Sequence, residues 1–225
     1  MVDVGAGTGV LTRALVETGA RVVALEADPA LAEALRRRFP GGRVTVVEAD
    51  ARRWAWPRAP FAVVSNLPFA GSGEILSSLL RDPRSGLRSA DVIVQWELAA
   101  KHAAVWPATM RATYWRAWFD IAIVARLTRR AFSPLPSVDA GVLRFTRRGR
   151  PRVPPDEHDR YRQFLAEAFR AQAPLQRALR GWLTPRELRR LASLLGFDPT
   201  AHARALDSRQ WAAVFSYAGG SRQER

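Results

Sequence analysis

Val2-Asp3-Val4-Gly5-Ala6-Gly7-Thr8-Gly9 is the most informative stretch of this chain, because it joins three kinds of local structure in order. An apolar strand end leads into a cluster of glycines, and the apolar spacing of 10–16 then predicts a helix. Glycines at such a junction let a ligand lie directly against the backbone and the helix N-terminus. Val10 stands where the dinucleotide fingerprint G-x-G-x-x-G requires its third glycine, which disfavours a nicotinamide or flavin site. A glycine-rich turn that binds nothing is the alternative.

Apolar strands and helices alternate after this loop. Strands are predicted at 21–27, 44–47, 61–65 and 91–95, and helices at 28–38 and 74–80. This alternation predicts an α/β fold, a doubly wound Rossmann-like parallel sheet with helices on both faces. Two further strands, 118–126 and 140–146, have no helix between them and suit an antiparallel hairpin at the sheet edge.

A small helical domain is expected at the C-terminal end. Residues 149–156 are polar and rich in proline, which is typical of a linker. A catalytic domain over 1–148 would therefore precede a helical RNA-binding domain over 157–218, and 219–225 would form a flexible tail. Thr184-Pro185-Arg186-Glu187 predicts a capping box at the start of a helix that Gly196 ends.

The composition points to a folded protein with a polyanionic partner. The net charge is +14 and the pI is near 11.6, so nucleic acid is the leading candidate. Cysteine is absent from the sequence, which excludes disulfides, thiolate catalysis and zinc fingers, and we expect no metal site. No apolar run reaches the roughly 20 residues of a membrane span, and no export signal begins the chain, so we expect a cytoplasmic monomer.

Acidic residues end the second and third predicted strands. Glu26 lies about 20 residues after the glycines, where a carboxylate can accept both ribose hydroxyls of an adenosyl cofactor, beside Ala27. Asp50, followed by Ala51, could accept the adenine amine of the same cofactor. The alternatives are a surface acid for Glu26 and a helix cap for Asp50. Their joint placement at the carboxyl ends of neighbouring strands favours binding.

Asn66-Leu67-Pro68-Phe69, directly after the strand 61–65, suits chemistry on an exocyclic adenine amine. Such an amine is a poor nucleophile, because its lone pair is delocalised into the ring. Acceptors for its two hydrogens, the Asn66 side-chain oxygen and the Leu67 carbonyl, favour a pyramidal nitrogen whose lone pair is free to attack. Pro68 stiffens the turn, and Phe69 can stack on a flipped-out base. An Asn-Pro turn with an aromatic residue in the core is the alternative.

These motifs together resemble the ribosomal RNA adenine N6-dimethyltransferase family, from Val2 to near Phe215. The resemblance implies a class I methyltransferase fold and S-adenosyl-L-methionine as cofactor. It also implies that Asn66, Leu67, Pro68 and Phe69 are catalytic, and that the cofactor is held by Asp3, Gly5, Gly7, Gly9, Glu26, Ala27, Asp50, Ala51 and Asn66. Two further stretches, 94–99 and 132–140, are similar to other family signatures.

Within the family, Phe69, the stretch 96–118 and the brief helical tail look most like the erythromycin-resistance methylases. Those enzymes methylate an adenine of 23S rRNA and protect ribosomes from macrolide, lincosamide and streptogramin B antibiotics. The housekeeping 16S rRNA dimethyltransferases, usually with Tyr at the Phe69 position, are the near alternative. A non-catalytic RNA-binding relative is a third reading, which the retained Glu26, Asp50 and Asn66 disfavour.

Two expectations concern other parts of the chain. Family members carry a few dozen residues ahead of the glycine loop, including a segment that closes over the cofactor. Because this sequence begins at the loop, we expect a misassigned start or a truncated relative, with weak cofactor binding and slow methylation. Farther along, Trp118 is assigned to the core, whereas base stacking and core packing are both open for Trp106 and Tyr114.

Overall fold

A computed structural model describes residues 1–223 and divides the chain into two compact units. The sheet unit comprises Met1–Ala103 and Asp120–Arg147, and the helical unit comprises Ala104–Phe119 and the chain from Arg148 onward. The structure therefore groups 104–119 with the helices, whereas the sequence placed that segment in the N-terminal domain. Segment 104–119 belongs to the helical unit because of long-range hydrogen bonds: the carbonyls of Ala117 and Trp118 accept from the amides of Arg152 and Arg148.

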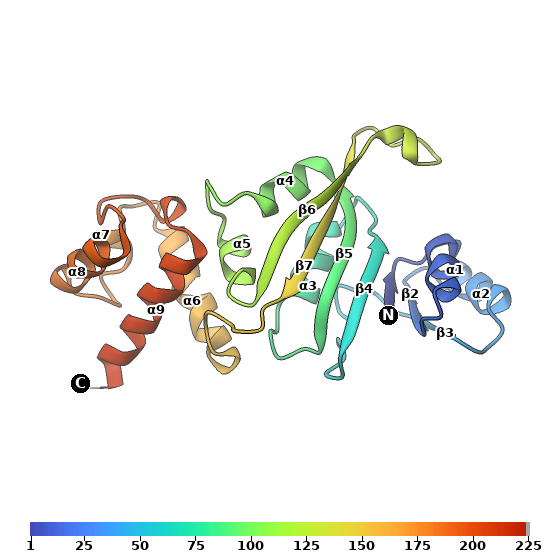
Figure 1. Ribbon diagram of the computed structural model, residues 1–225, viewed down its shortest axis with the longest axis horizontal. Coiled ribbons are helices and arrows are strands. Elements are labelled where there is room, and N and C mark those ends of the chain that lie inside the picture. The colour runs from blue at the N-terminus through green and yellow to red at the C-terminus, as the bar shows by residue number, and fades with distance from the viewer. Residues whose placement is uncertain (224–225) are drawn as a thin grey trace. The chain divides into compact units, whose positions relative to one another are not determined.

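The sheet unit alternates strands and helices, as the apolar periodicity predicts (Figure 1). Its strands are β1 (Val2–Val4), β2 (Val22–Glu26), β3 (Val44–Glu48), β4 (Phe61–Asn66), β5 (Leu87–Gln95), β6 (Phe119–Leu127) and β7 (Ala140–Arg147). Its helices are α1 (Val10–Glu17), α2 (Pro29–Arg38), α3 (Ser72–Leu79), α4 (Trp96–Ala103) and the 3-10 turn η1 (Arg129–Ala131). Asp28 caps α2 by accepting from the amides of Ala30 and Leu31, with Pro29 at the first helical position.

The seven strands form one sheet in the order β3-β2-β1-β4-β5-β7-β6. Neighbours from β3 to β5 are parallel, and β7 runs antiparallel to β5. The predicted fold class is confirmed, including the antiparallel strands at the sheet edge. The order reverses at β1, so the carboxyl ends of β1, β2 and β4 meet where such sheets bind ligands.

Strand β1 is short and central. Val2 pairs with Val23 on one side and with Val63 on the other, and Val2, Asp3 and Val4 are all buried.

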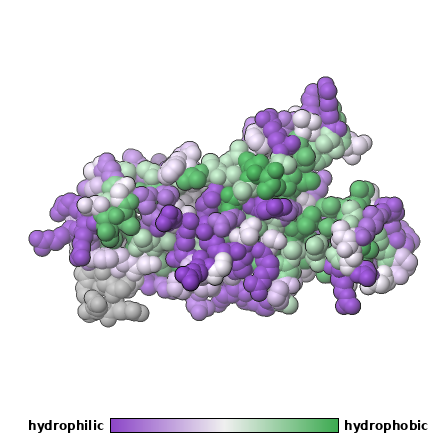
Figure 2. Space-filling view, viewed as in Figure 1, coloured by the Kyte–Doolittle hydropathy of each residue, from purple (hydrophilic) through white to green (hydrophobic). Residues whose placement is uncertain are grey.

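The connection from β6 to β7 extends past the ends of its strands (Figure 1). In the view of Figure 2, apolar side chains gather along β6, and hydrophilic side chains cover the tip of this connection.

The helical unit packs aromatic side chains into its own core. It contains α5 (Met110–Trp115), η2 (Pro155–Glu157), α6 (His158–Arg170), α7 (Leu175–Ala178), α8 (Pro185–Leu195), η3 (Ala203–Ala205) and α9 (Ser208–Gln223). The capping box at Thr184 and Glu187 is present, and Gly196 ends α8 with a left-handed φ of 69°. The predicted tail is corrected in part, because α9 continues to Gln223; residues 224–225 lie outside the described chain.

The predicted linker is anchored rather than loose. Val153 is fully buried, and its carbonyl accepts a hydrogen bond of 2.8 Å from the Trp118 indole. The amide of Arg152 donates to the Ala117 carbonyl at 2.8 Å. Proline in this stretch interrupts helix formation, as the sequence indicates, but the backbone between the prolines is held in place.

Candidate active site at the strand ends

The glycine loop turns between β1 and α1 in a conformation that favours glycine. Gly5 and Gly7 have φ values of 64° and 56°, in the left-handed region. The amide of Gly5 donates to the Leu25 carbonyl at 2.7 Å, which ties the loop to the end of β2. A Cβ atom at Gly5 would lie 3.3 Å from the Pro68 ring, so the catalytic tetrapeptide predicted from the sequence packs directly against the loop.

Glu26 joins the glycine loop to the end of β2. One carboxylate oxygen accepts from the Gly7 amide at 2.8 Å, and the other accepts from Ala27 and Asp28 at 2.8 and 2.9 Å. The side chain is buried, yet it lines a pocket. A carboxylate offers about four acceptor positions, so capacity remains for a ligand hydroxyl. Glu26 is therefore a scaffold for the loop as well as a candidate ligand residue.

Asp3 is a buried acid on the other side of the loop. It is 1% exposed, and its carboxylate accepts a hydrogen bond of 2.7 Å from the Thr12 hydroxyl. Burial raises the pKa of Asp3 to about 6, the Thr12 hydrogen bond opposes this rise, and the Glu26 charge adds to it. A buried carboxylate that resists ionisation is suited to bind a cation, which would restore its charged form.

Asp50 has a partner that the sequence did not indicate. Its carboxylate accepts from the Arg52 guanidinium in a bidentate arrangement, with distances of 2.7 to 3.0 Å. These hydrogen bonds from Arg52, the largest cause, lower the pKa of Asp50 to about 2. Asp50 thus stays ionised and oriented, and a ligand amine at this edge would share the carboxylate with Arg52.

The tetrapeptide 66–69 follows β4 and presents its polar groups at the strand end. Asn66 is the last residue of β4 and is exposed, whereas Leu67 is buried and its amide donates to the Ile93 carbonyl at 3.1 Å. Ser65 donates to the Val4 carbonyl at 2.5 Å, which holds β4 against β1. Phe69 is half-buried and meets Phe132 edge to face, with ring centroids 6.4 Å apart.

Two pockets flank the glycine loop within the sheet unit. The first, here called the strand-end pocket, has a volume of about 220 Å³. The second, here called the Asn66 pocket, has a volume of about 520 Å³. Gly5 lines both, so both spaces border the glycine loop. A ligand lying across Gly5 could therefore place one end beside Glu26 and Asp50 and the other beside Asn66.

The structure gathers most of the predicted site residues around these two spaces. The strand-end pocket is lined by Gly5, Glu26, Ala27, Asp50, Ala51 and Pro68 among others. The Asn66 pocket is lined by Asp3, Gly5, Gly7, Asn66, Ile93 and Phe132 among others. Gly9 lines neither; it lies at the N-terminus of α1, and a Cβ there would meet Leu35 and Phe39 at 2.8 Å. Leu67 and Phe69 are not among the residues that line either pocket.

Sequence reasoning missed Phe132 and Arg52 as site residues. Phe132 comes from the connection between β6 and β7, far along the chain, and reaches the Asn66 pocket. The stretch 132–140 resembles a family signature, but that resemblance does not by itself indicate a role for Phe132. The Arg52 contact depends on a side-chain rotamer, which the order of residues does not specify.

The aromatic stretch before β6 is largely core. Tyr114, Trp115 and Trp118 are 4%, 2% and 1% exposed, which confirms the assignment of Trp118. Trp106 is 60% exposed, and its indole donates to the Ala205 carbonyl at 3.1 Å. Among residues 1–223 no cluster of side chains is arranged to hold a metal ion. No helix in that range is long and apolar enough to cross a membrane.

Comparison with known proteins assigns a family to this arrangement. Residues 1–219 match the family described as ribosomal RNA adenine dimethylase. An rRNA adenine N-6-methyltransferase of Bacillus licheniformis is 31% identical, over 96% of this chain and 76% of its own. The mycinamicin-resistance protein MyrB of Micromonospora griseorubida is 34% identical, over 96% of this chain and 68% of its own. A ribosomal RNA small subunit methyltransferase A of Nocardia farcinica is 36% identical, over 92% and 76%.

Among solved structures, the fold resembles that of the 23S rRNA methyltransferase ErmE. The TM-score is 0.81, the sequences are 26% identical, and the likeness covers 97% of this chain and 90% of that one. A dimethyladenosine transferase from Plasmodium falciparum shares the fold with a TM-score of 0.70 at 16% identity.

Proposed function

Because this chain belongs to the ribosomal RNA adenine dimethylase family, we propose that it methylates N6 of an adenine in 23S rRNA with S-adenosylmethionine as donor. Such methylation would confer resistance to macrolide, lincosamide and streptogramin B antibiotics. The likeness to ErmE over nearly the whole chain supports this choice of rRNA most strongly. The relation to MyrB, a resistance protein by name, and Phe69 in the tetrapeptide agree with it.

The residues of the strand-end pocket fit an adenosyl group. Positive φ at Gly5 brings the backbone close to a ligand, Glu26 offers carboxylate oxygens for ribose hydroxyls, and Asp50 stays ionised at the pocket edge. Asp3, in the adjoining Asn66 pocket, suits a cationic group. S-adenosylmethionine, when bound, supplies a methyl group activated by a positively charged sulfonium.

The residues of the Asn66 pocket suit the target adenine. The Asn66 side-chain oxygen and the Leu67 carbonyl would accept the two hydrogens of the amine and direct its lone pair toward the methyl group. Phe132 lines this pocket and meets Phe69 edge to face, and aromatic rings at this position would hold the base by stacking. The nitrogen–carbon bond forms as the carbon–sulfur bond breaks, and the methylated amine releases a proton to water. Positioning of this kind can contribute roughly 7–11 kcal/mol to lowering the barrier.

A housekeeping methylation of 16S rRNA is the second candidate. The small subunit methyltransferase of Nocardia farcinica favours it, because its identity to this chain is 36%. The two candidates share the same chemistry and differ in the RNA that reaches the Asn66 pocket.

One expression experiment tests the proposal. The chain and its Asn66→Ala variant would be expressed in a macrolide-sensitive host whose 16S rRNA dimethylation has been deleted. We expect resistance, and methylated adenine in purified 23S rRNA by mass spectrometry, with the unmodified chain alone. Methylated adenine in 16S rRNA without resistance would establish the second candidate. Absence of methylation from both rRNAs would contradict the proposed activity.

A further inference from the structure

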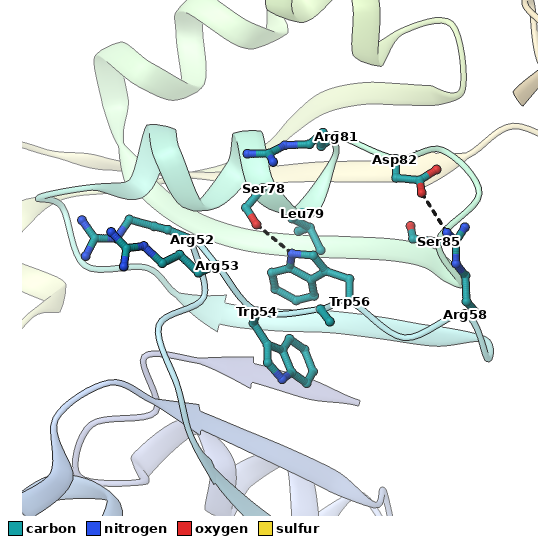
Figure 3. Close-up of a pocket in the computed structure, with 11 residues that line it drawn as sticks. Arg52, Arg53, Trp54, Trp56, Arg58, Ser78, Leu79, Arg81, Asp82 and Ser85 are labelled. Carbon is teal, nitrogen blue, oxygen red and sulfur yellow. Dashed lines mark hydrogen bonds and ion pairs between the residues drawn. The ribbon is translucent and has the colours of Figure 1, made fainter. Parts of the chain in front are cut away.

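Outside the two pockets of the active site, the sheet unit contains a strongly basic hollow, here called the arginine pocket (Figure 3). It has a volume of about 460 Å³ and lies between the connection from β3 to β4 and the C-terminal end of α3. Four arginines line it, Arg52, Arg53, Arg58 and Arg81, with Asp82 as the one acidic residue. Arg52 also lines the strand-end pocket, so the two spaces are neighbours.

The positive charge of this pocket exceeds the charge of the acids around it. Arg52 is paired with Asp50 at 2.7 Å, and the Asp82 carboxylate lies 3.1 Å from Arg58 and 3.0 Å from Arg84, which lies outside the lining, so the four lining arginines meet two carboxylates. Partial burial acts to raise the pKa of Asp82, but hydrogen bonds from Arg84 and the charges of Arg58 and Arg84 together lower it. Arg53 forms no ion pair with any of the described residues. A surplus of guanidinium groups around one hollow favours a polyanion, and guanidinium groups match phosphate oxygens in a bidentate way.

Aromatic rings stand among these guanidinium groups. Trp56 lies stacked on Phe61 with an interplanar angle of 7°, and its indole donates to the Ser78 hydroxyl at 3.0 Å. Trp54 meets Trp56 edge to face with centroids 4.9 Å apart, and it is only half-buried. Both rings are half-buried: Trp56 is held by Ser78 and Phe61, and Trp54 packs against Trp56 and keeps part of its surface accessible. Stacking on such a ring is available to any base.

Figure 3 shows how the two kinds of group are arranged. The side chains of Arg52 and Arg53 extend on one side of Trp56 and that of Arg58 lies on the other, while Arg81 lies beyond Ser78. Guanidinium groups on several sides of a ring system would let a strand place phosphates on the arginines and a base on Trp54. Trp56 lies in the middle of these side chains, and Trp54 lies next to it, on the side away from Ser78 and Arg81.

We propose that the arginine pocket binds a single-stranded segment of the substrate RNA outside the target adenine, with phosphates on Arg53 and Arg81 and a base stacked on Trp54. This inference rests on the proposed function for the identity of the RNA. It assigns a second RNA contact to the sheet unit itself, in a pocket that shares Arg52 with the strand-end pocket and shares no lining residue with the Asn66 pocket. An acidic protein segment is the competing occupant, and it would not use Trp54 for stacking.

Crosslinking locates the contact directly. A single-stranded RNA of mixed sequence, about 12 nucleotides long and carrying 4-thiouridine, would be photocrosslinked to the full chain. Tryptic cleavage after Arg53 and Arg58 releases the peptide 54–58, which contains both tryptophans of the pocket. We expect this peptide to carry the RNA adduct. Adducts confined to other peptides would overturn the inference.

Binding measurements with matched variants provide the second readout. Trp54→Ala should weaken binding of the same RNA about tenfold, and Trp54→Phe should retain most of the affinity. Arg53→Ala and Arg81→Ala should each reduce the slope of log affinity against log salt by about 0.7, the value for one phosphate on a single strand. Arg37→Ala, which removes an equal charge from the exposed end of α2, is the control and should leave the slope unchanged.

These results separate the inference from the proposed function. Equal loss of RNA affinity in Arg37→Ala and Arg53→Ala would show a general charge effect and would overturn the proposal that RNA binds in the arginine pocket. Unchanged binding in Trp54→Ala, with the variant folded by circular dichroism, would also overturn it. If either result is obtained and the unmodified chain still methylates rRNA, the proposed function is retained and RNA binding in the arginine pocket is not. Crosslinking at 54–58 without methylation of any rRNA would support RNA binding in the arginine pocket and contradict the proposed function.

Discussion

Because Asp3 is buried, its protonation affects both the stability of the fold and the charge of the site. Its pKa in the folded chain, about 6, is raised above the ordinary 3.8, so the protonated form is favoured by folding. The corresponding stability is fully present below about pH 4 and is lost as the pH rises through about 6. At neutral pH the ionised side chain is thus a cost to the fold, of about 3 kcal/mol at most. We interpret this cost as the consequence of placing an ionised Asp3 side chain in the interior, where it can bind a cationic ligand.

Cofactor affinity should therefore depend on pH through Asp3. A cation bound beside Asp3 lowers its pKa, so binding releases a proton when the pH is below about 6. We expect the affinity for S-adenosylmethionine, measured by isothermal titration, to be about tenfold weaker near pH 5 than near pH 7.5. Asp3→Asn should remove this dependence, weaken binding at neutral pH, and raise the unfolding free energy there. A pH profile identical in both proteins would exclude Asp3 from cation binding.

Asn66→Ala should separate catalysis from cofactor binding. Asn66 is exposed and lines the Asn66 pocket but not the strand-end pocket, so truncation of its side chain should leave the strand-end pocket intact. Losing one acceptor for the adenine amine should cost roughly 1–3 kcal/mol, or about tenfold to hundredfold in turnover. Single-turnover methylation and cofactor titration would be compared with those of Asp50→Ala, for which we expect weaker cofactor binding first. The reverse pattern would require the two roles to be exchanged.

The site was predictable from the sequence where the chain itself carries the geometry. Glycines between a strand and a helix, acids at strand ends and the tetrapeptide 66–69 lie close together because parallel strands end at one edge of a sheet. The contacts that depend on side-chain rotamers and burial were not predictable. The pairing of Asp50 with Arg52, the raised pKa of Asp3 and the approach of Phe132 to the pocket belong to this group.

Gly9 lies at the N-terminus of α1 and packs against side chains at the C-terminal end of α2. Substitution of Gly9 can therefore show whether this glycine of the loop is required for ligand binding or for helix packing. Its φ is 79°, and a Cβ would meet side-chain atoms of Leu35 and Phe39 at 2.8 Å. Gly9→Ala should therefore destabilise the fold by about 1–3 kcal/mol through overpacking and backbone strain. Urea unfolding would measure this, with cofactor affinity of the folded variant as the control. Lost affinity at unchanged stability would instead support the ligand role that the sequence predicted.

Element boundaries followed local signals wherever those signals were strong. Asp28-Pro29 and Thr184-Pro185 mark helix starts because capping and a fixed proline φ act over a few residues. The strand β5 begins at Leu87, earlier than the predicted 91, because its first residues pair with β4 and β7 across the sheet. Local patterns do not contain that pairing. The continuation of α9 through the glycines near residue 219 likewise contradicts their low helix propensity.

At the scale of the whole molecule, the hairpin β6–β7 interrupts the helical unit. Residues 104–119 enter that unit before the hairpin, and the chain returns to it at Arg148. The Arg148 amide donates to the Trp118 carbonyl at 2.8 Å, so the entry and return points are adjacent. Tyr114 hydrogen-bonds His158 at 3.2 Å, and Trp118 lies edge to face with Tyr161 at 5.9 Å. The core of the helical unit is thus built from two separate stretches of sequence.

This division predicts how fragments will fold. The fragment 148–225 lacks Tyr114, Trp115 and Trp118, and loss of one buried tryptophan alone costs about 3–5 kcal/mol, so it should not unfold cooperatively on heating. Joining 104–119 to 148–225 through a short Gly-Ser turn should restore a cooperative transition, because the joined ends are already hydrogen-bonded neighbours. Calorimetry of both fragments would measure this, with Trp118→Ala in the joined fragment as control. Cooperative unfolding of 148–225 alone would instead support the boundary at 148 predicted from the sequence.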